Sequence, residues 1–94
     1  MRLQRSEISN LKNSIFLFDK NAKIYLFGSR VDEQKRGGDI DILVISDILN
    51  EKNRRKIRRN FFQEFGEQKL DIIIENQKKI SLFGREILEK AIEI

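Results

Sequence analysis

Apolar side chains along this chain follow two spacings, one typical of helices and one typical of strands. In residues 6–18 they recur near every 3.6 residues, which predicts an amphipathic helix that ends around Asn21. The same spacing returns in residues 47–66, where Gly66 favours a helix stop, and in residues 80–91. The pattern predicts three helices whose core positions are Ile8, Leu11, Ile15, Phe18, Ile57, Phe61, Phe62, Phe65, Ile80, Phe83, Ile87 and Ala91.

Three short segments have the composition of strands. Residues 23–27 are rich in β-branched and aromatic side chains, are apolar on both faces and end at a Gly-Ser pair. Residues 39–45 and 70–75 place alternate side chains on opposite faces, while the polar stretch 30–38 is expected to be a loop. The order α-β-β-α-β-α predicts an α+β fold, with helices packed on a small mixed sheet of three strands or slightly more.

Aspartate side chains open or interrupt two of these apolar strands. Asp39 and Asp41 are two residues apart, so they lie on one face, about 6.6 to 6.8 Å apart along the backbone, and can converge on one or two metal ions. Asp71 interrupts the third strand, although aspartate is poorly suited to strands. Adjacent carboxylates repel each other, and a bound cation relieves that repulsion. An isolated Asp-x-Asp pair is also compatible with an exposed strand edge, and Glu75, on the same face as Asp71, is placed outside the site.

The chain contains no cysteine and no histidine, which excludes disulfides, a thiol nucleophile, Cys-ligated metals and an imidazole base. Carboxylates remain as metal ligands, and they favour hard ions such as Mg²⁺ or Mn²⁺. A length of 94 residues is enough for one core, so we expect a single domain over residues 1–94. Neither a secretory signal nor a membrane-spanning stretch is recognisable, and we therefore expect a cytoplasmic protein with no membrane contact.

The pair Gly28-Ser29 ends the first predicted strand. Glycine lets backbone N–H groups approach an anion and serine adds a hydroxyl donor, so the turn suits a triphosphate. An isolated Gly-Ser pair is more often a plain strand-ending turn. Its spacing from the aspartates is what favours a phosphate-binding role.

Residues 26–30 (Leu-Phe-Gly-Ser-Arg), a spacer of nine residues after Ser29, and residues 39–44 (Asp-Ile-Asp-Ile-Leu-Val) resemble the signature of the DNA-polymerase-β-like nucleotidyltransferases. Within that superfamily the chain most resembles the minimal nucleotidyltransferases of bacteria and archaea. Their third aspartate, on a later strand, is matched by Asp71. The resemblance extends over essentially the whole chain.

The resemblance implies a site and a reaction. The implied catalytic and metal-binding residues are Asp39, Asp41 and Asp71, and the implied phosphate-binding residues are Gly28, Ser29 and Arg30. The implied reaction moves a nucleoside monophosphate, AMP from ATP, onto a protein acceptor with Mg²⁺ or Mn²⁺. In many relatives the acceptor is a HEPN-domain toxin and the transferase is its antitoxin, so a hetero-oligomer with such a partner is expected.

One part of the signature departs from the family pattern. Many relatives carry a basic-glycine pair after Gly-Ser-Arg and a ten-residue spacer, whereas residues 31–33 (Val-Asp-Glu) follow here and the spacer has nine residues. We interpret the difference as a subfamily variant in which Lys35 and Arg36 supply nearby positive charge.

Two other functions stay open at this stage. A catalytically silent module could neutralise a partner by occlusion, although it would have no need for three clustered acids. A small basic nucleic-acid-binding protein could use the six cations of residues 52–59, in a chain of net charge +4. Helical spacing spreads those cations around the helix and no aromatic residue is interleaved with them, which favours a solvated helix face over nucleic-acid contact.

Overall fold

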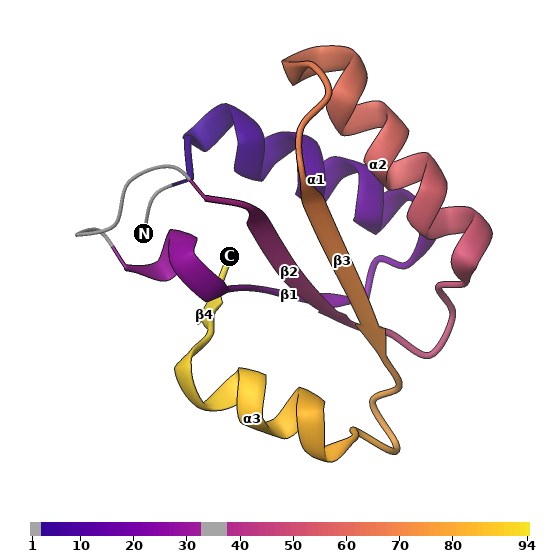
Figure 1. The fold of residues 1–94 in the computed structure, drawn as a ribbon. Helices are drawn as coiled ribbons and strands as arrows, with labels where there is room; N and C mark the ends of the chain where they lie inside the picture. Colours follow the sequence, from indigo (N-terminus) through magenta and orange to yellow (C-terminus); the bar gives the residue numbers. More distant parts are fainter. Residues whose placement is uncertain (1–2, 33–37) are drawn as a thin grey trace.

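The computed structural model describes residues 3–32 and 38–94, in which helices cover both faces of one sheet (Figure 1). In chain order the elements are α1 (Arg5–Phe18), β1 (Lys23–Phe27), the 3-10 helix η1 (Gly28–Val31), β2 (Ile40–Ile45), α2 (Glu51–Phe65), β3 (Leu70–Glu75), α3 (Leu82–Lys90) and β4 (Ile92–Glu93). The three predicted helices and three predicted strands are confirmed. The prediction of a loop over residues 30–38 is wrong for its first two residues, which belong to η1.

The sheet is mixed, with strand order β3-β2-β1-β4. Strand β1 is antiparallel to both β2 and β4, whereas β2 and β3 run parallel. Strand β4 was not predicted, because its two residues are too few to show an alternating pattern; they pair with Tyr25 and Leu26 of β1. The observed order within the described residues is therefore α-β-β-α-β-α-β, an α+β fold as expected.

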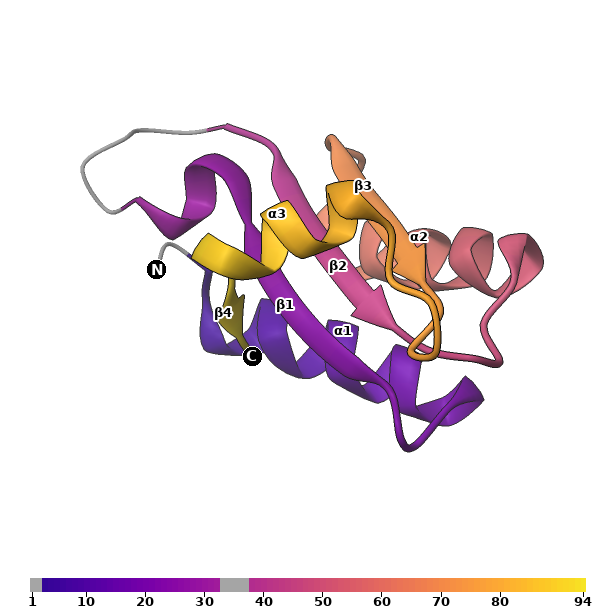
Figure 2. The same cartoon turned by 90° about the horizontal axis from the view of Figure 1, so that it is seen from below.

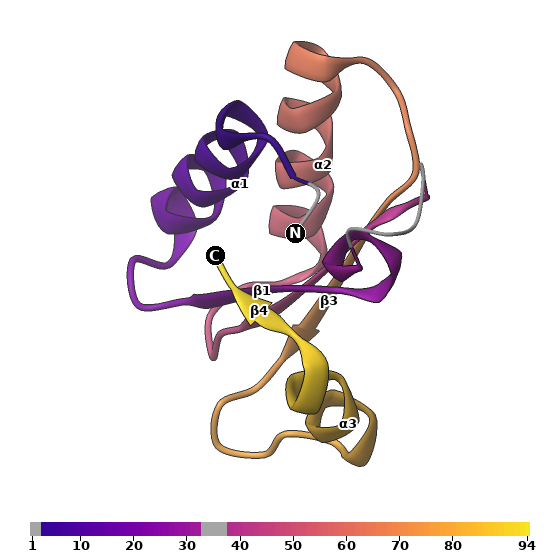
Figure 3. The ribbon, with the colours of Figure 1, turned by 90° about the vertical axis from the view of Figure 1, so that its left-hand side faces the viewer.

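Helices α1 and α2 lie side by side over one face of the sheet (Figure 3). Their apolar stripes meet the even-numbered positions of β2, which point to this face. The fully buried side chains of this main core include Leu11, Ile15, Ile24, Leu26, Ile40, Ile42, Val44, Ile57, Phe61 and Ile72. Phe62 and Phe65 pack against it, as predicted.

Helix α3 crosses the opposite face (Figure 2). Ile87 is its buried anchor, and it packs with Leu43 and Ile45, the odd-numbered positions of β2. The prediction that Phe83 is a core residue is wrong: Phe83 lies in the first turn of α3 and its side chain is 57% exposed. The helix buries its Gly84 and Ile87 side instead, so this smaller core covers only part of the sheet face.

A buried network of hydrogen bonds links the carboxyl end of β2 to the carboxyl end of α1. Asp19, which is 6% exposed, accepts hydrogen bonds from Ser46 Oγ at 2.6 Å and from the Asn21 backbone N–H at 3.0 Å. Ser46 Oγ in turn accepts from the backbone N–H groups of Ile48 and Leu49, both at 3.1 Å. The charge of Asp19 is thus matched by donors, as a buried carboxylate requires.

Local signals account for the ends of α2. Asn50 and Asn53 exchange side-chain and backbone hydrogen bonds at its start, and Gly66, with a φ of 85°, terminates it as predicted. In the described part of the chain, no helix is long and apolar enough to cross a membrane.

Candidate active site

The three aspartates singled out in the sequence meet at one end of the sheet, where β1 ends and β2 and β3 begin. In the parallel register of β2 and β3, Asp41 lies directly opposite Asp71, so both carboxylates project from the α3 face. Phe27, the last residue of β1, is the partner of Asp41 on the other side. The register therefore brings Asp71 to Asp41, which sequence alone could only suggest.

Asp39 lies just before β2 and contacts a cation instead of a second acid. Its Oδ2 atom is 3.4 Å from Nζ of Lys69, and the two side chains are 46% and 68% exposed. An ion pair so exposed contributes little to stability and is readily exchanged for another partner. Lys69 was not singled out from the sequence, although strand parity places it on the same face as Asp71, two residues earlier.

The turn after β1 approaches Asp41 closely at Gly28. The φ of Gly28 is 76°, a left-handed conformation that glycine adopts without strain. A Cβ atom added at this position would lie 2.4 Å from Oδ2 of Asp41, well inside van der Waals contact. The carboxylate of Asp41 therefore rests against the Gly28 backbone, in space that any other side chain would fill.

Gly28 is also the first residue of η1, and Ser29 and Arg30 follow it in that 3-10 helix. Arg30 Nε donates to the backbone carbonyl of Gly38 at 3.4 Å, so both ends of the loop are linked. Ser29 and Arg30 are both engaged in interactions within the chain. Lys35 and Arg36, the expected source of positive charge, lie outside the described residues.

The electrostatics of the site centre on Asp41. Partial burial raises the pKa of the Asp41 carboxyl above its ordinary 3.8, and the hydrogen-bonding contact with Asp71 and the charges of Asp71 and Asp39 raise it further. Lys69 acts in the opposite direction. Two carboxylates directly opposite each other in a sheet are destabilising unless a proton or a cation lies between them.

A divalent cation fits this donor set by its chemistry. The side chains that converge here offer hard carboxylate oxygens, which suit Mg²⁺ and Mn²⁺, and no soft ligand competes with them. Across residues 3–32 and 38–94, however, no three acidic side chains are already arranged around a common metal position. The contact of Asp39 with Lys69, two positions before Asp41 and Asp71 on their strands, agrees with that observation.

Glu75 does not belong to this acidic group. It lies at the far end of β3, where its carboxylate accepts from the Ser81 backbone N–H at 2.8 Å and from Ser81 Oγ at 2.9 Å. Glu75 thereby anchors the start of α3, away from Asp41 and Asp71 at the other end of the strand.

A mixed four-stranded sheet covered by α1 and α2 on one face and α3 on the other is the polymerase-β-like nucleotidyltransferase fold. The family model described as "Nucleotidyltransferase domain" matches residues 8–94. The chain therefore belongs to the nucleotidyltransferase domain family.

A solved structure supports the same fold. The chain is similar to a chain in the structure of a tri-AMPylated Shewanella oneidensis HEPN toxin in complex with MNT antitoxin. The TM-score is 0.55 and the identity 20%, over 93% of this chain and 70% of that chain. No curated protein matches the sequence. At this identity the solved structure establishes the shared fold and nothing more specific.

Proposed function

We propose that this chain is a metal-dependent protein adenylyltransferase that moves AMP from ATP onto a HEPN-domain partner and acts as its antitoxin within a hetero-oligomer. The observation that carries the proposal is the pairing of Asp41 with Asp71, together with the approach of Asp41 to the backbone of Gly28 across a gap too small for a Cβ atom. Membership of the nucleotidyltransferase family supports the transfer chemistry. The fold shared with a chain from a complex that holds a tri-AMPylated HEPN toxin supports the choice of AMP and of the partner.

In this proposal Asp39, Asp41 and Asp71 hold Mg²⁺ or Mn²⁺. The ion would supply charge neutralisation for the acids and for the phosphates of ATP. Lys69 releases Asp39 when the acids take up a ligand, since their ion pair is exposed and weak. The backbone of Gly28, the hydroxyl of Ser29 and the guanidinium of Arg30 are assigned to the β- and γ-phosphates.

The reaction is an in-line displacement at phosphorus. The hydroxyl oxygen of the acceptor attacks the α-phosphorus of ATP, the bond from that phosphorus to the bridging oxygen breaks, and pyrophosphate leaves. In this proposal Asp71, on the edge strand β3, receives the hydroxyl proton. Nucleotidyl transfer depends mainly on positioning and charge stabilisation, so a site without histidine is chemically sufficient.

The direct test is incubation with ATP labelled in the α-phosphate, Mg²⁺ and a candidate HEPN protein. The wild type should label the partner, and the double variant Asp39→Asn/Asp41→Asn should not. A matched control is Glu86→Gln/Glu89→Gln, which neutralises two exposed carboxylates on α3 and should label the partner normally. If neither the wild type nor the aspartate variant transfers label while both still neutralise the partner, the protein acts by occlusion and the enzymatic proposal is wrong.

A further inference from the structure

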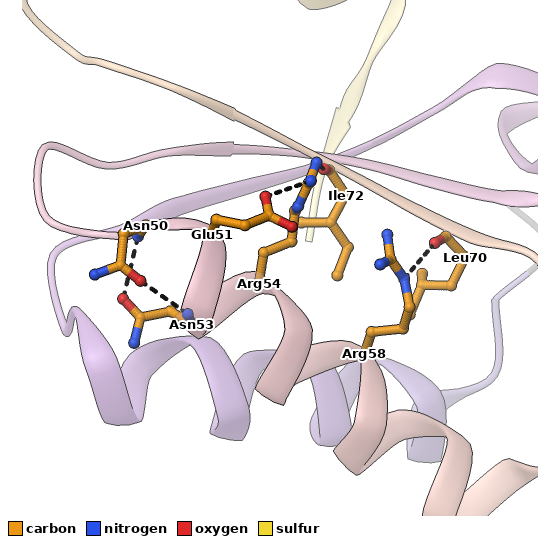
Figure 4. A network of polar contacts seen from close by, with 7 residues as sticks. All are labelled: Asn50, Glu51, Asn53, Arg54, Arg58, Leu70 and Ile72. Atoms are coloured by element: carbon orange, nitrogen blue, oxygen red, sulfur yellow. Dashed lines mark hydrogen bonds and ion pairs between the residues drawn. The ribbon is translucent and has the colours of Figure 1, made fainter.

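The six cations of residues 52–59 do not form one uniform solvated helix face. Arg54 Nη1 donates to the Ile72 carbonyl at 3.3 Å, and Arg58 Nε donates to the Leu70 carbonyl at 3.2 Å (Figure 4). Both carbonyls belong to β3, which is an edge strand of the sheet, and its outward groups have no strand partner among the residues that the structure describes. These two arginines therefore protect the sheet edge, which is a structural role that the sequence did not reveal.

The cations on the outer side of α2 form a different feature. Arg55, Arg58 and Arg59 line a pocket of about 540 Å³ together with Phe62, Gln63 and Glu67. Within the described residues, neither Arg55 nor Arg59 forms an ion pair. Helix α2 packs on the face of the sheet opposite to the one from which Asp41 and Asp71 project, and the lining of this arginine pocket includes neither aspartate.

The lining combines two kinds of group that recognise different parts of one ligand. Arginine guanidinium groups bind phosphate through paired hydrogen bonds and also stack on flat rings. Phe62, which is half-buried against the main core, adds a fixed aromatic ring at the same pocket. The absence of an aromatic residue among residues 52–59 had argued against stacking, but α2 places Phe62 on the same side as Arg59, one turn away, and Arg55, two turns away.

We propose that the arginine pocket binds single-stranded nucleic acid, with Arg55 and Arg59 on phosphates and Phe62 stacked on a base. Three guanidinium groups against the single carboxylate of Glu67 leave the pocket positive. An acidic peptide would satisfy the arginines but would have no flat group for Phe62. Duplex nucleic acid stacks its bases internally, so it offers phosphates alone. The inference goes beyond the proposed transfer activity and does not depend on it.

The test measures binding of a fluorescently labelled single-stranded oligoadenylate in EDTA, so that the acidic site contributes no metal. We expect Arg55→Ala/Arg59→Ala to weaken binding roughly tenfold or more and to lower the slope of log affinity against log salt by about 1.4, since each lost phosphate contact on a single strand removes about 0.7. The matched control Lys78→Ala/Lys79→Ala removes two exposed charges from the turn before α3 and should change binding little.

Phe62→Leu tests the stacking part, because leucine keeps the apolar contact with the core but has no ring. It should weaken oligoadenylate binding about five- to tenfold and leave the salt slope unchanged. Asp39→Asn/Asp41→Asn should bind as the wild type does, which separates this result from failure of the transfer proposal. Three results would each overturn the proposal. The lysine double variant could lose as much affinity as the arginine double variant, the matching duplex could bind as tightly as the single strand, or a polyglutamate peptide could compete as well as unlabelled oligoadenylate.

Discussion

The aspartates near the two ends of β2 lie in opposite electrostatic environments. At the carboxyl end, Asp19 is 6% exposed and receives hydrogen bonds from Ser46 and the Asn21 backbone. At the amino end, Asp41 faces a second carboxylate, Asp71, and its pKa is raised chiefly by burial and then by that contact. The hydrogen bonds to Asp19 stabilise the fold. The repulsion between Asp41 and Asp71 destabilises it, and a bound cation would relieve that repulsion. Such uncompensated charge is typical of functional sites.

Neutralising the acids at the amino end of β2 should have the largest effect, and that effect should be on catalysis. Asp41→Asn and Asp71→Asn should each reduce transfer of AMP by about a hundredfold to a thousandfold, because each removes a charge that the transition state requires. The measurement is the initial rate of partner labelling from α-labelled ATP. Asp19→Asn, at the opposite end of β2, should label the partner at nearly the wild-type rate per folded molecule.

Gly28→Ala tests whether the amino end depends on its close backbone contact. A Cβ atom there would lie 2.4 Å from Asp41 Oδ2, so the carboxylate must move and the transfer rate should fall about a hundredfold. The left-handed backbone of residue 28 should add a stability loss of about 1–2 kcal/mol. Near-normal transfer by a folded Gly28→Ala protein would contradict the assignment of this turn to the site.

At the carboxyl end the expected effect is on folding. Asp19→Ala removes the acceptor of two hydrogen bonds in a buried position and should lower the free energy of unfolding by roughly 1.5–3 kcal/mol. Urea denaturation measures the change, with the exposed carboxylate variant Glu89→Ala as the control. A loss no larger than that of the control would mean that the network does not stabilise the junction of α1 and β2.

The smallest expected effect is on stability at the amino end of β2. There the loss of a carboxylate, that of Asp41, should stabilise the protein, whereas the loss of Asp19 should destabilise it. The folded pKa of Asp41 lies above 3.8, so the folded state binds the proton more tightly than the unfolded chain does, and stability falls as the pH rises from about 3.8 through the raised pKa. Asp41→Asn should remove that part of the pH dependence and raise the thermal midpoint at pH 7 by on the order of a few degrees or less. Thermal unfolding of both proteins between pH 3 and 7 in EDTA tests this; a lower midpoint for the variant at pH 7 would contradict it.

Much of this fold could be predicted from sequence because its elements have strong periodicity. The apolar stripes of α1 and α2 and the alternation in β2 and β3 are local properties, and the observed elements follow them closely. Strand β4 and the exposure of Phe83 could not be predicted in this way, since a two-residue strand has no period and the burial of Phe83 depends on how far α3 covers the sheet.

The site could be predicted only in part, for a related reason. Strand parity places Asp39 and Asp41 on one face, but the pairing of Asp41 with Asp71 is a register between strands 30 residues apart, which no local pattern determines. The contact of Asp39 with Lys69 and the role of Arg58 at the β3 edge are likewise tertiary contacts. Metal binding and the roles of the phosphate-contacting residues stay predictions.

The central claim is that the acids at the amino end of β2 hold a divalent cation, and binding of Mn²⁺ tests it most directly. Electron paramagnetic resonance of free Mn²⁺, titrated with protein in the absence of nucleotide and again with a non-hydrolysable ATP analogue, measures the bound ion. We predict saturable binding by the wild type that is stronger with the analogue, is lost in Asp41→Asn/Asp71→Asn and is retained in Glu86→Gln/Glu89→Gln. Binding by the aspartate variant equal to that of the wild type under both conditions would contradict the account.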